Sequence, residues 1–126
     1  MFTVGVRRQF IARHYLIGGN WGSENVIHSH HYALEVSLEG PKLNEHGYLM
    51  DIVEIEDRLD GIMARLRDSV LNELPEFAGL NPSIEHLADQ CCRWLQEGLR
   101  NPPLTAVCVK VFENNDVWAS CHREIS

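Results

Sequence analysis

The chain has 126 residues, a length that predicts one domain spanning residues 1–126, and its 44% hydrophobic content is enough for one core. Eleven basic against eighteen acidic residues give a net charge of −7 without a basic stripe, which argues against nucleic acid as a partner. No apolar run is long enough to span a membrane, and the N-terminus lacks the apolar segment of a signal peptide. We therefore expect a cytoplasmic protein.

Two alternating segments open the chain and carry three histidines. Residues 2–14 alternate between apolar and polar, and His14 is in phase with the apolar positions. In residues 28–38, His28 and His30 share one strand face with Tyr32 and the apolar side chains that follow. If the two strands pair as an antiparallel hairpin across the loop 15–27, the three imidazoles converge on one face.

Imidazoles on an apolar face need a partner for each ring nitrogen, and neighbouring imidazoles rarely all find protein partners. Without His14, the alternative to a metal site is that His28 and His30 are two histidines at a strand end whose ring nitrogens have hydrogen-bond partners in the protein. With His14 added, three ligands and one open position are typical of a catalytic zinc site. The sequence therefore predicts Zn²⁺ bound by His14, His28 and His30.

Two helices are predicted after the hairpin. Asp51 and Glu54 form a capping box at the start of the first, which buries a stripe from Ile55 to Leu66. In the second, Asn81 is the predicted N-cap and Pro82 the first helical residue, and the helix stops before residues 102–103, which are both proline.

Two further strands are predicted to close the chain. The apolar alternation of residues 105–111 ends in Glu113, so a carboxylate stands where another buried side chain is expected. Residues 114–116 then turn the chain back into a strand over residues 117–123. The whole pattern, β-β-α-α-β-β, predicts the α+β class. The four cysteines lack the CxxC spacing of a zinc knuckle, which indicates reduced core or interface thiols.

Six segments, in order and covering nearly the whole chain, resemble the family of 6-pyruvoyl-tetrahydropterin and 6-carboxy-tetrahydropterin synthases. These segments are residues 10–14, 28–32, 47–51, 71–72, 82–85 and 109–113. The resemblance implies a tunnelling fold, in which a four-stranded antiparallel sheet carries two helices on one face. It also implies that three subunits join into a barrel, commonly with two barrels stacked as a hexamer.

The resemblance implies a site as well as a fold. It assigns the zinc to His14, His28 and His30, and the guanidine-like edge of a pterin to Glu113, whose carboxylate can accept two parallel hydrogen bonds. Glu85, near the start of the second helix, would be a secondary contact in the pterin pocket.

Three positions depart from the family pattern. Ser29 replaces the glycine between the two histidines, and Glu24 stands where the family has its cysteine, four positions before the first histidine of that motif. The family's Asp-His pair before Leu71 is replaced by Arg67 and Asp68. Either Asp68 or His86 is a candidate to replace the missing relay histidine.

These groups favour a zinc-dependent lyase that acts on the side chain of a 7,8-dihydropterin, either dihydroneopterin or its phosphates. Zinc would lower the pKa of the substrate hydroxyls, while Glu24 takes a proton from the 2′-hydroxyl in a retro-aldol cleavage. The expected product is 6-hydroxymethyl-dihydropterin. The alternatives are 6-pyruvoyl- or 6-carboxy-tetrahydropterin synthase activity, a catalytically inactive pterin-binding protein, and metal storage or structural zinc.

Overall fold

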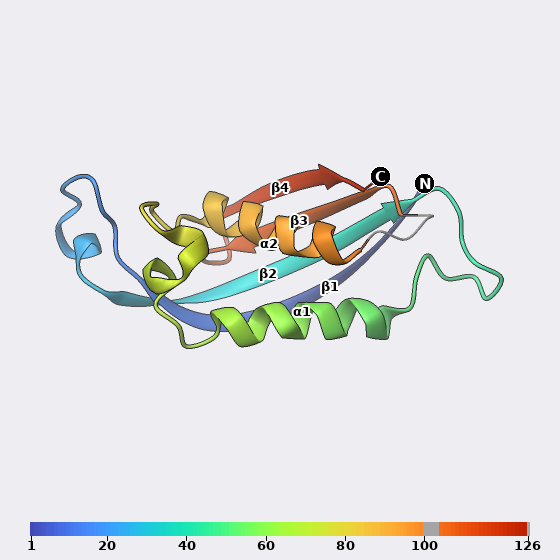
Figure 1. The fold of residues 1–126 in the computed structure, drawn as a ribbon, viewed down its shortest axis with the longest axis horizontal. Coiled ribbons are helices and arrows are strands. Elements are labelled where there is room, and N and C mark those ends of the chain that lie inside the picture. Colours follow the sequence, from blue (N-terminus) through green and yellow to red (C-terminus); the bar gives the residue numbers. More distant parts are fainter. Residues whose placement is uncertain (100–103, 126) are drawn as a thin grey trace.

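A computed structural model of the protein describes residues 1–99 and 104–125. The four strands are β1 (Phe2–His14), β2 (His28–Gly40), β3 (Ala106–Phe112) and β4 (Trp118–Glu124), and they form one antiparallel sheet in the order β1-β2-β3-β4. The helices α1 (Ile52–Leu66) and α2 (Ile84–Gly98) lie in the connection between β2 and β3 (Figure 1). This arrangement confirms the predicted β-β-α-α-β-β fold.

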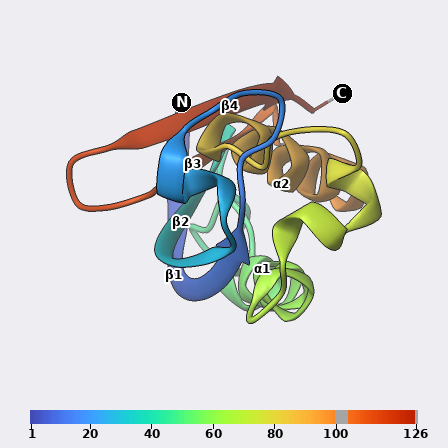
Figure 2. The same cartoon turned by 90° about the vertical axis from the view of Figure 1, so that its left-hand side faces the viewer.

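Both helices cover the same side of the sheet (Figure 2). Helix α1 packs against β1, and α2 packs against β3 and β4. The apolar stripe predicted for α1 is buried, from Ile55 to Leu66, and so are Leu87, Cys91 and Leu95 of α2. Each such side chain contributes about 1.5–3 kcal/mol when it leaves water, so this layer is the core of the fold. Neither helix is long and apolar enough to cross a membrane, in the part of the chain that the structure describes.

The two helix starts differ in how well the sequence predicts them. Asp51 is the N-cap of α1, and its carboxylate accepts from the Val53 N–H at 2.9 Å. The Glu54 carboxylate lies 3.6 Å from the Arg58 guanidinium, which confirms their predicted pairing on the exposed side of α1. Among the described residues the Glu54 side chain makes no hydrogen bond to the Asp51 N–H, so the predicted capping box is only half formed. The N-cap predicted for α2 is wrong, because Ser83 caps it by accepting from the His86 N–H. Helix α2 ends at Gly98, and the predicted stop at residues 102–103 lies outside the described residues.

The pairing of β1 with β2 sets the positions of the three histidines. In this antiparallel ladder His14 lies opposite His28, and Ala12 lies opposite His30. Residues opposite each other share a sheet face, and residues two apart on one strand share it too. The register therefore brings the three imidazoles to the same face at the end of the hairpin.

Two asparagines attach the loop 15–27 to the rest of the fold. Asn72, in the short 3₁₀ helix η2 (Leu71–Glu73), accepts from the Tyr15 N–H at 3.0 Å and donates to the Tyr15 carbonyl at 2.9 Å. Asn81 does the same for Ile17, at 2.7 and 3.1 Å. Each asparagine side chain thus makes the two backbone hydrogen bonds that a neighbouring strand would make, beyond the point where the β1–β2 ladder ends. Asn81 does not cap α2 because its side chain is used in this contact.

The loop is also closed internally by Asn25. This residue ends the 3₁₀ helix η1 (Gly22–Asn25), and its side chain donates to the carbonyls of Leu16 and Gly19 at 2.9 and 3.0 Å. The Leu16 N–H donates to the Glu24 carbonyl at 2.9 Å, which closes the base of the loop. The backbone of residues 15–25 is therefore held at both its ends.

Replacing Asn72 by Ala tests the attachment of this loop. The change leaves the Tyr15 N–H and carbonyl without their side-chain partner, at a cost of about 1–3 kcal/mol. We expect the amides of residues 15–17 to exchange with solvent deuterium about tenfold to hundredfold faster, while those of β3 stay protected. Asn115→Ala, in the exposed turn between β3 and β4, is the matched control. Unchanged exchange at residues 15–17 would show that Asn72 does not hold the loop.

Candidate metal centre

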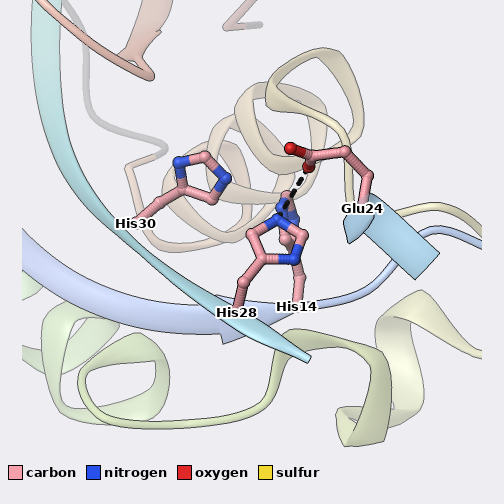
Figure 3. Close-up of side chains that lie close together, drawn as sticks. All are labelled: His14, Glu24, His28 and His30. Carbon is pink, nitrogen blue, oxygen red and sulfur yellow. Dashed lines mark ion pairs between the residues drawn. The ribbon is translucent and has the colours of Figure 1, made fainter. Parts of the chain in front are cut away.

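Three imidazoles form a cluster at the end of the β1–β2 hairpin (Figure 3). The ring centroids lie 4.6 Å apart for His14 and His28, 4.8 Å for His14 and His30, and 4.9 Å for His28 and His30. Each pair is arranged edge to face, with interplanar angles of 73–78°. The predicted convergence of His14, His28 and His30 is therefore present in the structure.

Backbone carbonyls fix the tautomers of two of these rings. The Nδ1 of His28 lies 2.7 Å from the Val26 carbonyl, and the Nδ1 of His14 lies 3.2 Å from the Pro82 carbonyl. A carbonyl only accepts, so each Nδ1 carries the hydrogen and each Nε2 keeps its lone pair. Metal-binding histidines typically donate the N–H of their other ring nitrogen to a carbonyl or carboxylate in this way.

Burial keeps His14 neutral. The residue is 5% exposed, and this burial lowers the pKa of its imidazole, with a further lowering from His30 and His28. The hydroxyl of Tyr32 lies 3.3 Å from the same Nδ1 that meets Pro82. Burial, and the carboxylates of Glu113 and Glu24, raise the pKa of Tyr32, so its hydroxyl stays protonated.

The Nε2 atoms of His28 and His30 are buried, and neither finds a hydrogen-bond partner among residues 1–99 and 104–125. A buried nitrogen without a partner costs about 1–3 kcal/mol, and two at one point are rarely tolerated. A divalent metal between the rings would satisfy both lone pairs. The residues present therefore fit a zinc ion bound through His14, His28 and His30.

Glu24 joins the three histidines from the loop. One ligand atom from each of the four residues lies within 4.8 Å of the others. The Oε2 of Glu24 is 2.9 Å from the His28 Nε2 (dashed in Figure 3), although the angles do not make this contact a hydrogen bond. The side chain of Glu24 is 51% exposed. A carboxylate thus lies beside the imidazole nitrogens of the cluster and is open to solvent.

Glu113 is a second carboxylate near the histidine cluster. Its Oε1 is 3.8 Å from the His30 Nε2, and its side chain is 36% exposed, at the start of the turn that follows β3. A cleft of about 310 Å³ also reaches Glu113, but Gln9, His31 and Ala33 line it from the sheet face opposite the one that carries the histidine cluster. The short distance to His30, and not the cleft, would therefore bring a ligand of the Glu113 carboxylate to the candidate metal centre.

The remaining predicted site residues lie outside the four-residue group. Asp68 follows α1 with a left-handed backbone (φ 60°), donates its N–H to the Ile11 carbonyl at 2.7 Å and is exposed. Glu85 and His86 are exposed in the first turn of α2, and the His86 Nδ1 lies 2.7 Å from the Asn81 carbonyl. Their roles stay predictions.

Several residues of this centre were not predicted from the sequence. The sequence contains a signal that could have identified Tyr32 as a site residue, because a tyrosine in phase with two histidines on a buried face needs a polar partner. The carbonyls of Val26 and Pro82 have none, since any residue supplies a carbonyl. Asn72 and Asn81 occur in recognisable motifs, but their contacts with Tyr15 and Ile17 depend on the tertiary fold.

Known proteins are similar to this chain in sequence and in fold. A sequence model of the family described as 6-pyruvoyl tetrahydropterin synthase matches residues 3–124. A protein of Archaeoglobus fulgidus, named provisionally as a 6-carboxy-5,6,7,8-tetrahydropterin synthase, is 29% identical over 120 residues, which is 95% of each chain. A dihydroneopterin monophosphate aldolase of Pyrococcus furiosus is 30% identical over 94 residues, which is 75% of this chain and 71% of that protein.

Among solved structures, the 6-pyruvoyl tetrahydropterin synthase of Caenorhabditis elegans superposes with a TM-score of 0.82 at 19% identity. The superposition covers 95% of this chain and 94% of that one. At this identity the likeness bears on the fold, and it confirms the predicted tunnelling fold of one subunit. Since the family's sequence model extends over nearly the whole chain, this protein belongs to the 6-pyruvoyl tetrahydropterin synthase family.

Proposed function

We propose that this protein is a zinc-dependent lyase that cleaves the side chain of a 7,8-dihydropterin, dihydroneopterin or one of its phosphates, to give 6-hydroxymethyl-dihydropterin. The observation that carries the proposal is the carboxylate of Glu24 beside the three imidazoles. The similarity to a dihydroneopterin monophosphate aldolase also supports it.

The metal would be held by His14, His28 and His30. When bound, zinc acts as a Lewis acid that lowers the pKa of the substrate hydroxyls and stabilises a developing alkoxide. Glu113, 3.8 Å from the His30 Nε2, would accept two hydrogen bonds from the guanidine-like edge of the pterin. Glu85 would make a secondary contact with the ligand. These contacts direct the side chain of the substrate toward Glu24.

Glu24 would act as the general base. Its carboxylate takes the proton of the 2′-hydroxyl, the oxygen forms a carbonyl, and the bond between C1′ and C2′ breaks. The electron pair passes to C1′ and into the pterin ring, and a proton returns to C1′. The products are 6-hydroxymethyl-dihydropterin and a two-carbon aldehyde, so no external oxidant or reductant is needed.

Asp68 and His86 are the two candidates for moving the second proton. Both are exposed in the single chain, so neither needs to leave a packed position to meet a substrate. The proposed assembly is a trimeric barrel, alone or stacked as a hexamer. Because β1 and β4 are the edges of the sheet, pairing between subunits would satisfy their open backbone groups.

Two other functions are favoured by particular observations. The similarity to the A. fulgidus protein favours 6-carboxy-tetrahydropterin synthase activity, and the related 6-pyruvoyl product belongs to the same class of chemistry. The absence of the family's cysteine from position 24 favours a protein that binds pterin without converting it. Simple metal storage would leave Glu113 without a purpose, so Glu113→Gln would then change no measurable property.

Product analysis distinguishes these functions. The zinc-loaded protein is incubated separately with dihydroneopterin, its monophosphate and its triphosphate, and the products are identified by mass spectrometry. We expect 6-hydroxymethyl-dihydropterin, and we expect its formation to stop when a chelator removes the metal and to resume when zinc is restored. A carboxy or pyruvoyl product would favour the synthase alternatives. Tight binding measured by calorimetry without turnover under any divalent metal would favour a binding protein.

Glu24→Gln tests the general base. At saturating zinc, with the metal content verified, we expect kcat to fall about 10²-fold to 10⁴-fold, because the amide cannot take the proton. The dissociation constant of the pterin should change little, because the main binding contact is proposed to be the pair of hydrogen bonds with Glu113. Glu97→Gln, on the exposed side of α2, is the matched control. Full activity in Glu24→Gln would rule out this base.

A further inference from the structure

We propose that Glu24 is also the fourth metal ligand of the resting protein and that its carboxylate closes the open coordination position until the substrate displaces it. The inference rests on the metal site of the proposed function, but it does not depend on which pterin reaction follows. It assigns Glu24 two successive roles, first as a ligand and then as a base.

The distances suit a four-ligand site. The donor atoms of His14, Glu24, His28 and His30 all lie within 4.8 Å of one another. A tetrahedral zinc with bonds of about 2.0–2.1 Å places its ligand atoms roughly 3.3 Å apart. The four donors therefore need to approach one another by at most about 1.5 Å, which side-chain rotation alone can provide.

The contact between Glu24 and His28 suits a shared metal ion. The Nδ1 of His28 donates to the Val26 carbonyl, so in the neutral ring the Nε2 carries a lone pair. This nitrogen lies 2.9 Å from a carboxylate oxygen, yet the two atoms do not form a hydrogen bond. Two lone pairs at this distance repel each other unless a positive charge lies beside both. A metal ion shared by the imidazole and the carboxylate removes the repulsion.

The other nearby carboxylate is a poorer ligand. Glu113 is 3.8 Å from the His30 Nε2 and does not belong to the group whose donor atoms lie within 4.8 Å of one another. It is also the carboxylate that is proposed to bind the pterin. Of the two carboxylates, Glu24 is therefore the one placed to close the coordination sphere.

The backbone of Glu24 is fixed while its side chain is free to move. The Leu16 N–H holds the Glu24 carbonyl, and Asn25 ties the loop to Leu16 and Gly19. The side chain itself is 51% exposed. A carboxylate on such an anchor can leave the metal when two hydroxyl oxygens of a substrate arrive and still remain within reach of their protons. Arrival of the substrate would thus release the base that acts on it.

The test uses the cobalt(II)-substituted protein and azide as a small anionic probe. Azide changes the visible spectrum of cobalt(II) when it enters an open coordination position. We expect the apparent dissociation constant of azide to be at least tenfold lower in Glu24→Gln and Glu24→Ala than in the wild type. Glu113→Gln is the matched control and should behave as the wild type does.

Equal azide affinity in the wild type and both Glu24 variants would overturn the proposal. An apparent dissociation constant of azide that falls at least tenfold in Glu113→Gln would also overturn it. If both Glu24 variants fail to retain cobalt while keeping the wild-type circular dichroism spectrum, and Glu113→Gln retains it, that result also supports Glu24 as a ligand. No pterin is present in this experiment, so its outcome is independent of the product analysis.

Discussion

The antiparallel register of β1 and β2 is the constraint on which the candidate site depends. His14 lies opposite His28, and His30 is two residues further along the same strand, so one ladder places three imidazoles on one face. A slip of one residue would turn His28 and His30 to the opposite face of the sheet. The apolar side chains that follow in β2, such as Tyr32 and Leu34, are buried in the correct register and oppose this slip. The core therefore fixes the geometry of the metal centre.

A second condition is that the rings are correctly oriented. The carbonyls of Val26 and Pro82 accept from Nδ1 of His28 and His14, so the Nε2 atoms face the centre with their lone pairs. Pro82 lies just before α2, and Asn81 beside it holds Ile17. The start of α2, the loop 15–27 and the end of β1 thus form one hydrogen-bonded unit. The second helix consequently contributes to the site through its first residues as well as to the core.

The strands, the order of elements and the convergence of the histidines could be predicted from the sequence, because alternation and a hairpin are local patterns with few geometric solutions. The position of Glu24 beside the imidazoles could not be derived in this way, since it depends on how Asn25 and Leu16 close the loop. The predicted cap at Asn81 failed for a related reason. An Asn-Pro pair is a local helix-start signal, whereas the real use of this side chain is a contact 64 residues away in sequence.

The membership of the family and the geometry of the site bear on different questions. The family match establishes the family and the fold of this chain, while Glu24 stands at the position where the resemblance places the family's cysteine. A carboxylate that can serve the metal and the substrate in turn would suit a single bond cleavage, which needs fewer proton transfers than elimination with internal redox. The proposed reaction therefore rests on the residues of the candidate metal centre rather than on the fold.

The most direct test of this account is anomalous X-ray scattering at the zinc absorption edge, from crystals grown with zinc. The account predicts one strong anomalous peak bound by a nitrogen from each of His14, His28 and His30. A structure with these three rings turned apart and no anomalous peak between them would contradict it, and the proposed pterin chemistry would lose its basis.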